Sequence, residues 1–124
     1  MTDGVNPDAS KAATDDRKPI DWAHLARQTM GDAELEVELL ALFSTQAGEF
    51  GGKLGSAPSD KARLDLAHTL KGAARAIGAF ALGDAAEEYE SAVAAAEGAP
   101  DRLHALSARL DEAQQAIAVR LGRR

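Results

Sequence analysis

The chain has 124 residues, of which 45% are hydrophobic and only 4% aromatic, and its formal net charge is −6 at pH 7. This length predicts one domain with a modest core of aliphatic residues and alanine. The sequence contains no cysteine, which excludes disulfides and thiolate metal sites. The acidic balance argues against a general binder of nucleic acid or membranes. With no apolar run of the ~18 residues that span a membrane and no secretory signal at the start, we expect a cytoplasmic protein.

Helical periodicity runs through most of the chain, and no alternating strand pattern competes with it. Residues 1–19 are polar and proline-containing, which predicts a disordered tail. The spacing of apolar residues predicts helices at about 21–28, 32–48, 59–78, 80–97 and 101–121. The residues expected as N-caps are Asp21, Asp32, Ser59 and Asp101. We therefore predict an all-α fold, in which residues 20–124 form an antiparallel four-helix bundle with a short additional N-terminal helix at one end.

The helix around residue 70 has one clear inner face. Four apolar residues recur there at three- and four-residue spacing, namely Leu66, Leu70, Ala74 and Ile77, and they form a narrow stripe. His68 lies roughly 160° from Leu70 around the helix axis. The imidazole is therefore expected on the solvent side. In the preceding helix, the corresponding inner stripe includes Leu42 and Phe43.

Gly72 is an unusual residue for the middle of this helix, because glycine there costs about 1 kcal/mol relative to alanine. A side chain at position 72 would lean over residue 68, so the glycine leaves His68 open to a large group. Lys71 leans toward His68 as well. Residues 61–75 carry four basic residues against the single acid Asp65, which predicts a positive patch. This environment suits a phosphoryl group on the imidazole.

These residues resemble the histidine-containing phosphotransfer (HPt) domains of bacterial multistep phosphorelays. The resemblance rests on His68-Thr69-Leu70-Lys71-Gly72, then Gly78-Ala79, Leu82 and Tyr89-Glu90. Ala73-Ala74 replace the serine pair that often follows the first glycine of the motif. The resemblance covers about residues 20–121 and independently implies a helical bundle.

The resemblance implies that the protein relays a phosphoryl group between receiver-domain aspartates of response regulators or hybrid histidine kinases. His68 would be the phosphoacceptor, and Lys71 and Arg75 would stabilise the phosphoryl oxygens. No P-loop or ATP-binding module is present in the sequence, so we expect a phosphocarrier without kinase activity. The chain is expected to be a monomer that binds no cofactor, with Mg²⁺ on the receiver.

The sequence also suggests supporting residues near His68. Leu64, Gly72 and Ala79 are expected to form the surface on which the receiver docks. Either Asp65 or Glu90 could bind the His68 ring and fix its tautomer, and the sequence leaves this choice open. A metal site is not expected, because the Asp residues that precede His24 and His104 are explained as helix caps.

Two alternatives remain from the sequence. One is the phosphoacceptor domain of a chemotaxis-type kinase, which would need an ATP-binding module that 124 residues cannot accommodate. The other is a non-catalytic helical adaptor that binds a receiver domain without being phosphorylated. The phosphorelay protein and the adaptor differ in what loss of His68 would do, because only the phosphorelay protein would lose its function.

Overall fold

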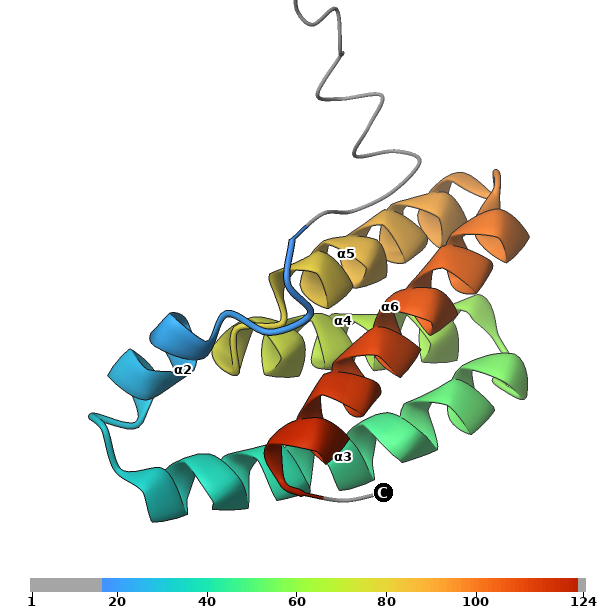
Figure 1. Cartoon of the computed structure of the whole chain (residues 1–124). Helices are drawn as coiled ribbons and strands as arrows, with labels where there is room; N and C mark the ends of the chain where they lie inside the picture. Colours follow the sequence, from blue (N-terminus) through green and yellow to red (C-terminus); the bar gives the residue numbers. More distant parts are fainter. Residues whose placement is uncertain (1–16, 123–124) are drawn as a thin grey trace, which may run out of the picture.

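The computed structural model describes residues 17–122, which form helices and no strand. The helices are α2 (Trp22–Gln28), α3 (Ala33–Gly55), α4 (Asp60–Ala76), α5 (Phe80–Ala95) and α6 (Ala99–Arg120). Figure 1 shows α4 lying beside α5, α3 on the opposite side of the bundle, α6 crossing the front, and α2 at one end. The predicted all-α bundle is thereby confirmed. Most of the predicted tail, residues 1–16, lies outside the described residues.

Side-chain caps explain where several helices begin. Asp21, Asp32 and Ser59 each accept a hydrogen bond from a backbone N–H in the first turn of the next helix, as predicted. Such a bond satisfies an amide that has no partner inside the helix, and it stabilises by about 1 kcal/mol. The prediction for Asp101 is wrong, because α6 begins at Ala99, after Gly98 in the left-handed conformation. Asp101 lies instead in the first turn, where its charge favours the helix dipole.

The core is built from aliphatic residues and alanine, with few aromatic rings. The four long helices contribute Leu40, Phe43, Ala47, Phe50, Leu54, Ala67, Leu70, Ala74, Leu82, Ala85, Ala86, Tyr89, Val93, Leu106, Leu110, Ala113 and Ile117. On α4, the predicted inner residues Leu70 and Ala74 are fully buried, whereas Leu66 is only partly buried and Ala67 takes its place. His68 therefore follows a buried residue directly and points outward.

Helix α3 is longer than the sequence suggested. It was expected to end near Gly48, but it continues through two further glycines to Gly55. Phe50 and Leu54 continue the buried face of α3. Burial of such side chains contributes about 1.5–3 kcal/mol each, which outweighs the cost of about 1 kcal/mol for each helical glycine.

The inner face of α3 agrees with the prediction at Phe43 but not at Leu42. Leu42 was expected in the core, yet it is 56% exposed, whereas Leu40 is fully buried. Leu40, Phe43 and Ala47 follow one another at three- and four-residue spacing, so they share one side of the helix, and Leu42 falls outside that side. The prediction for Phe43 is therefore confirmed, whereas the prediction for Leu42 is wrong.

At Gly78, the turn between α4 and α5 contacts the start of α2. Gly78 has a φ of +90°, and a Cβ there would lie 2.7 Å from the backbone oxygen of Asp21. The Gly78 carbonyl also accepts a hydrogen bond of 2.8 Å from the Asp21 amide. Next to it, the His24 ring packs edge-on against Phe80, with 4.9 Å between ring centroids. These contacts fix the turn that sets α4 against α5.

Candidate functional site

His68 projects from the outward side of α4, and its side chain is 73% exposed. One turn along, Gly72 is exposed as well, and a Cβ built there would meet nothing within 4 Å beyond its chain neighbours and the nearby backbone of its own helix. Packing among the described residues therefore does not require glycine at this position. Gly72 and His68 thus lie together on an exposed face of α4.

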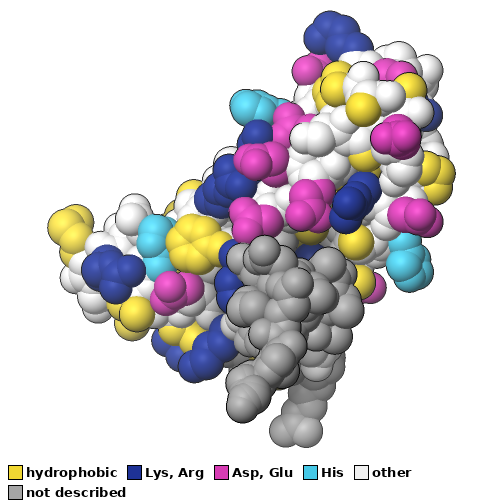
Figure 2. Space-filling view, turned by 90° about the horizontal axis from the view of Figure 1, so that it is seen from above, with side chains coloured by type: hydrophobic (Ala, Val, Ile, Leu, Met, Phe, Trp, Pro, Cys, Tyr) yellow, Lys and Arg dark blue, Asp and Glu magenta, His cyan; other side chains and the backbone are white. Residues whose placement is uncertain are grey.

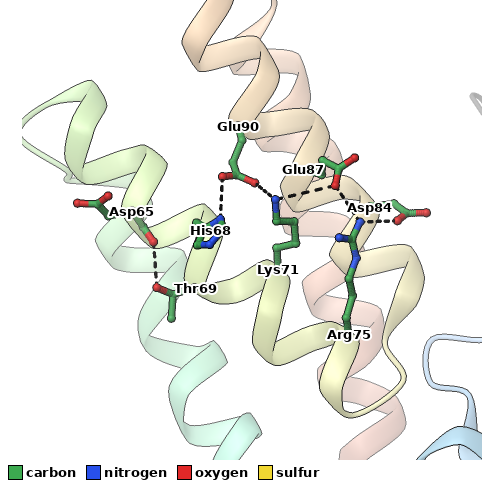
Figure 3. A network of polar contacts seen from close by, with 8 residues as sticks. All are labelled: Asp65, His68, Thr69, Lys71, Arg75, Asp84, Glu87 and Glu90. Atoms are coloured by element: carbon green, nitrogen blue, oxygen red, sulfur yellow. Dashed lines mark hydrogen bonds and ion pairs between the residues drawn. The ribbon is translucent and has the colours of Figure 1, made fainter.

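Glu90 of α5 is the carboxylate that meets His68. Its Oε2 lies 3.4 Å from His68 Nδ1, and its side chain is only 19% exposed. Of the two candidates that the sequence left open, the geometry thus brings Glu90 to the ring (Figure 3). The carboxylate of Asp65 instead forms an ion pair of 3.0 Å with Lys61, four residues before it on α4.

Lys71 lies on the other side of the same carboxylate. Its Nζ is 2.7 Å from Glu90 Oε1 and 3.9 Å from Glu87 Oε1, and its side chain is 19% exposed. Glu90 Oε1 is buried and makes no hydrogen bond. The Lys71 ammonium therefore forms an ion pair with this oxygen, but not a hydrogen bond. One half-buried carboxylate thus touches both the imidazole and the ammonium.

Arg75 lies one turn beyond Lys71, and its guanidinium points to the start of α5. Its Nη2 donates hydrogen bonds to Asp84 Oδ1 at 3.0 Å and to Glu87 Oε1 at 3.1 Å. The hydrogen bond to Asp84, supported by Glu87 and opposed by partial burial, raises the pKa of Arg75 above its ordinary value. Figure 3 shows that this cation is directed toward α5 and away from His68. The structure therefore does not bring Arg75 to the imidazole.

A family model for the Hpt domain matches residues 38–116, which include His68, Lys71 and Glu90. This match covers more than half of the chain. The chain belongs to the Hpt domain family. No curated protein and no solved structure gives a significant match. Membership of the Hpt family supports a general role in histidine phosphotransfer within phosphorelays, in which Hpt domains interact with receiver domains.

The predicted positive patch is not present around the histidine of this Hpt domain. Each basic residue of the stretch 61–75 has an acidic neighbour, and α5 supplies three of these carboxylates, from Asp84, Glu87 and Glu90. Figure 2 shows acidic side chains interspersed with basic ones on the face seen there. The charge of the stretch 61–75 was misleading because Asp60 lies just before it and α5 supplies the carboxylates that pair with Lys71 and Arg75.

Two residues predicted to form the docking surface of the Hpt domain differ from expectation. Ala79 has no exposed surface, so its predicted contribution to docking is wrong. It belongs to the turn packed into the core at the start of α5. Leu64 is partly buried and packs against the core, although part of it remains accessible. Gly72 alone of the three is exposed.

Two further properties concern the whole described part of the Hpt domain. Between residues 17 and 122, no three His, Cys, Asp or Glu side chains are grouped so that they could hold a metal ion. Over the same range, none of the helices combines the length and apolar composition that crossing a membrane requires.

Proposed function

We propose that this Hpt domain accepts a phosphoryl group on His68 from the aspartyl phosphate of one receiver domain and passes it to the aspartate of another. The observation that supports this most directly is the exposure of His68, 73% of the side chain, on a helix face that Gly72 leaves open. A receiver must bring its aspartate within bonding distance of the imidazole, and an uncovered ring permits that approach.

The contact with Glu90 suggests which ring nitrogen reacts. A carboxylate at 3.4 Å from Nδ1 favours the tautomer that carries its proton on Nδ1. The lone pair is then on Nε2, the nitrogen remote from Glu90. Nε2 would attack phosphorus, while the P–O bond to the donor aspartate breaks and leaves its electron pair on the carboxylate.

The ring keeps its Nδ1 proton during this step and becomes positively charged. The negative charge of Glu90 would stabilise that form of the ring. In the second half-reaction, an oxygen of the acceptor aspartate attacks phosphorus, and the electron pair of the N–P bond returns to Nε2. Protons and charges therefore balance without a separate general base.

Lys71 would supply the positive charge for the phosphoryl oxygens. It lies three residues after His68 on the same helix, and both side chains touch the Glu90 carboxylate. As charge builds up on the transferring group, the ammonium can interact with its oxygens at little cost in reorganisation. Mg²⁺ is expected on the receiver. A cytoplasmic location and a monomeric state remain predictions from the sequence.

The test is incubation of the purified protein with a phosphorylated receiver and Mg²⁺, followed by measurement of acid-labile phosphate on the Hpt domain. Wild type should be labelled, and His68→Gln should not be labelled although its helical circular dichroism is unchanged. His104→Gln is the matched control, because it removes an exposed histidine of α6. Its labelling should equal that of wild type.

Labelling of His68→Gln would contradict the assignment of the phosphoacceptor. Binding of receivers by wild type without any labelling would favour the non-catalytic adaptor instead. The adaptor also predicts that His68→Gln leaves function intact.

A further inference from the structure

A continuous row of charges crosses the seam between α4 and α5. Neighbouring side chains alternate in sign and lie within 3.9 Å of each other, in the order Asp84, Arg75, Glu87, Lys71 and Glu90, next to His68. Figure 3 shows how the row runs from the start of α5 to the imidazole. Removal of one charged side chain from such a row changes which oppositely charged partner the remaining side chains favour.

Glu87 is the member of the row shared by two cations. Its Oε1 lies 3.1 Å from Arg75 Nη2 and 3.9 Å from Lys71 Nζ. Lys71 is thus placed between two carboxylates, and it lies closer to Glu90, at 2.7 Å. The Arg75 guanidinium neutralises the carboxylate that competes with Glu90 for the ammonium.

Gly83 explains why Arg75 can reach Glu87. A Cβ at position 83 would lie 2.8 Å from Arg75 Cγ and 3.0 Å from its Nε. The missing side chain therefore lets the arginine lie flat across the first turn of α5. Asp84 holds the guanidinium there through Oδ1, while its Oδ2 is 3.0 Å from Arg17 Nη1.

We propose that Arg75 is a positioning residue for Lys71: by occupying Glu87, it keeps the Lys71 ammonium on Glu90, beside His68. Without the guanidinium, Glu87 loses the closer of its two cations. The other cation, Lys71, then lies only 3.9 Å from the Glu87 carboxylate. The ammonium then moves toward Glu87, one helical turn away from the imidazole. The consequence for transfer rates rests on the proposed phosphotransfer at His68, whereas the position of the ammonium does not.

The first test is therefore structural and needs no receiver. In a crystal structure of Arg75→Ala, Lys71 Nζ should lie closer to Glu87 than to Glu90, the reverse of the order in wild type. An ammonium that stays on Glu90 in this variant overturns the proposal. Gly83→Ala gives a second route, since it keeps the arginine but displaces it from α5, and the same shift of Lys71 is expected.

The second test measures phosphoryl transfer from a phosphorylated receiver. Arg75→Ala should lower the maximal rate about three- to tenfold, while the receiver concentration at half-saturation stays the same. Adding Glu87→Gln should restore most of the lost rate, because the competing charge is then gone. Glu87→Gln measured alone completes the double-mutant cycle. An equal loss with and without Glu87→Gln overturns the proposal, since a purely structural role of Arg75 gives no such rescue.

Arg102→Ala is the matched control. It removes another arginine that pairs with a glutamate of α5, Glu88 at 3.4 Å, but this pair does not touch Lys71. Its transfer rate should equal that of wild type. If wild type accepts no phosphoryl group at all, the proposed function fails, and the crystallographic comparison still decides where Arg75 holds Lys71.

Discussion

The seam between α4 and α5 and the second half of α3 use glycine in opposite ways. In the seam, Gly83 lies under Arg75, and any side chain there would collide with it. In α3, the space around Gly51, Gly52 and Gly55 is open, with no atom within 4 Å of a built Cβ. The first glycine is explained by a neighbour within the chain, whereas the other three only reduce the helix propensity of α3.

Gly72 resembles the α3 glycines in its surroundings, yet it lies one turn from His68. Its Cβ position is equally open, so contacts within the described residues do not account for it. Its place beside the proposed phosphoacceptor connects this glycine with the docking of a receiver. Packing thus requires Gly83, whereas the proposed docking requires Gly72, and the following variants test that difference.

The largest effect on phosphoryl transfer should come from replacing Lys71 in the seam. Lys71→Ala should lower the maximal rate of phosphoryl transfer roughly tenfold to a hundredfold, because a charge that stabilises the transition state is lost. The receiver concentration at half-saturation should change little. Rapid-quench kinetics over a range of receiver concentrations separates the two quantities.

Lys53→Ala is the corresponding change on α3, where Lys53 pairs with Glu49 at 3.6 Å. It should transfer at the wild-type rate. Equal rates for Lys71→Ala and wild type would remove the proposed role of Lys71.

Gly72→Ala should have a smaller effect on transfer, and it should raise stability while it lowers the transfer rate. The alanine should raise the free energy of unfolding by about 0.5–1 kcal/mol, since it favours the helix and meets open space. Transfer should nevertheless become slower, because the new methyl group lies on the face by which a receiver would approach His68. Urea unfolding and transfer kinetics on the same preparation measure both. A more stable variant that transfers as fast as wild type would show that docking does not require this glycine.

The smallest effect on transfer is expected for a glycine of α3, whose replacement should change stability alone. Gly52→Ala should raise the free energy of unfolding by about 0.5–1 kcal/mol, as Gly72→Ala does, and leave transfer unchanged. A Cβ at position 52 would meet open space, so the alanine should disturb no contact with another helix. Gly83→Ala should bring no such gain, because Arg75 must move to make room. Urea denaturation midpoints of the two variants give the comparison, and equal gains would contradict it.

The sequence alone determined the features that depend on residues close together in the chain. Apolar spacing placed the helices and turned His68 outward, and short polar residues marked three of the helix starts. The motif from His68 to Gly72 led to the Hpt family before any geometry was known. These predictions held because periodicity and capping act within one or two helical turns.

Tertiary structure decided which side chains meet across helices. It chose Glu90 over Asp65 as the partner of His68, directed Arg75 toward α5, and neutralised the basic stretch of α4 with carboxylates twelve or more residues away in several cases. It also buried Ala79 and extended α3 through its glycines. Each of these outcomes depends on how α3, α4 and α5 pack and rotate against one another, and a single helix's pattern does not contain that information.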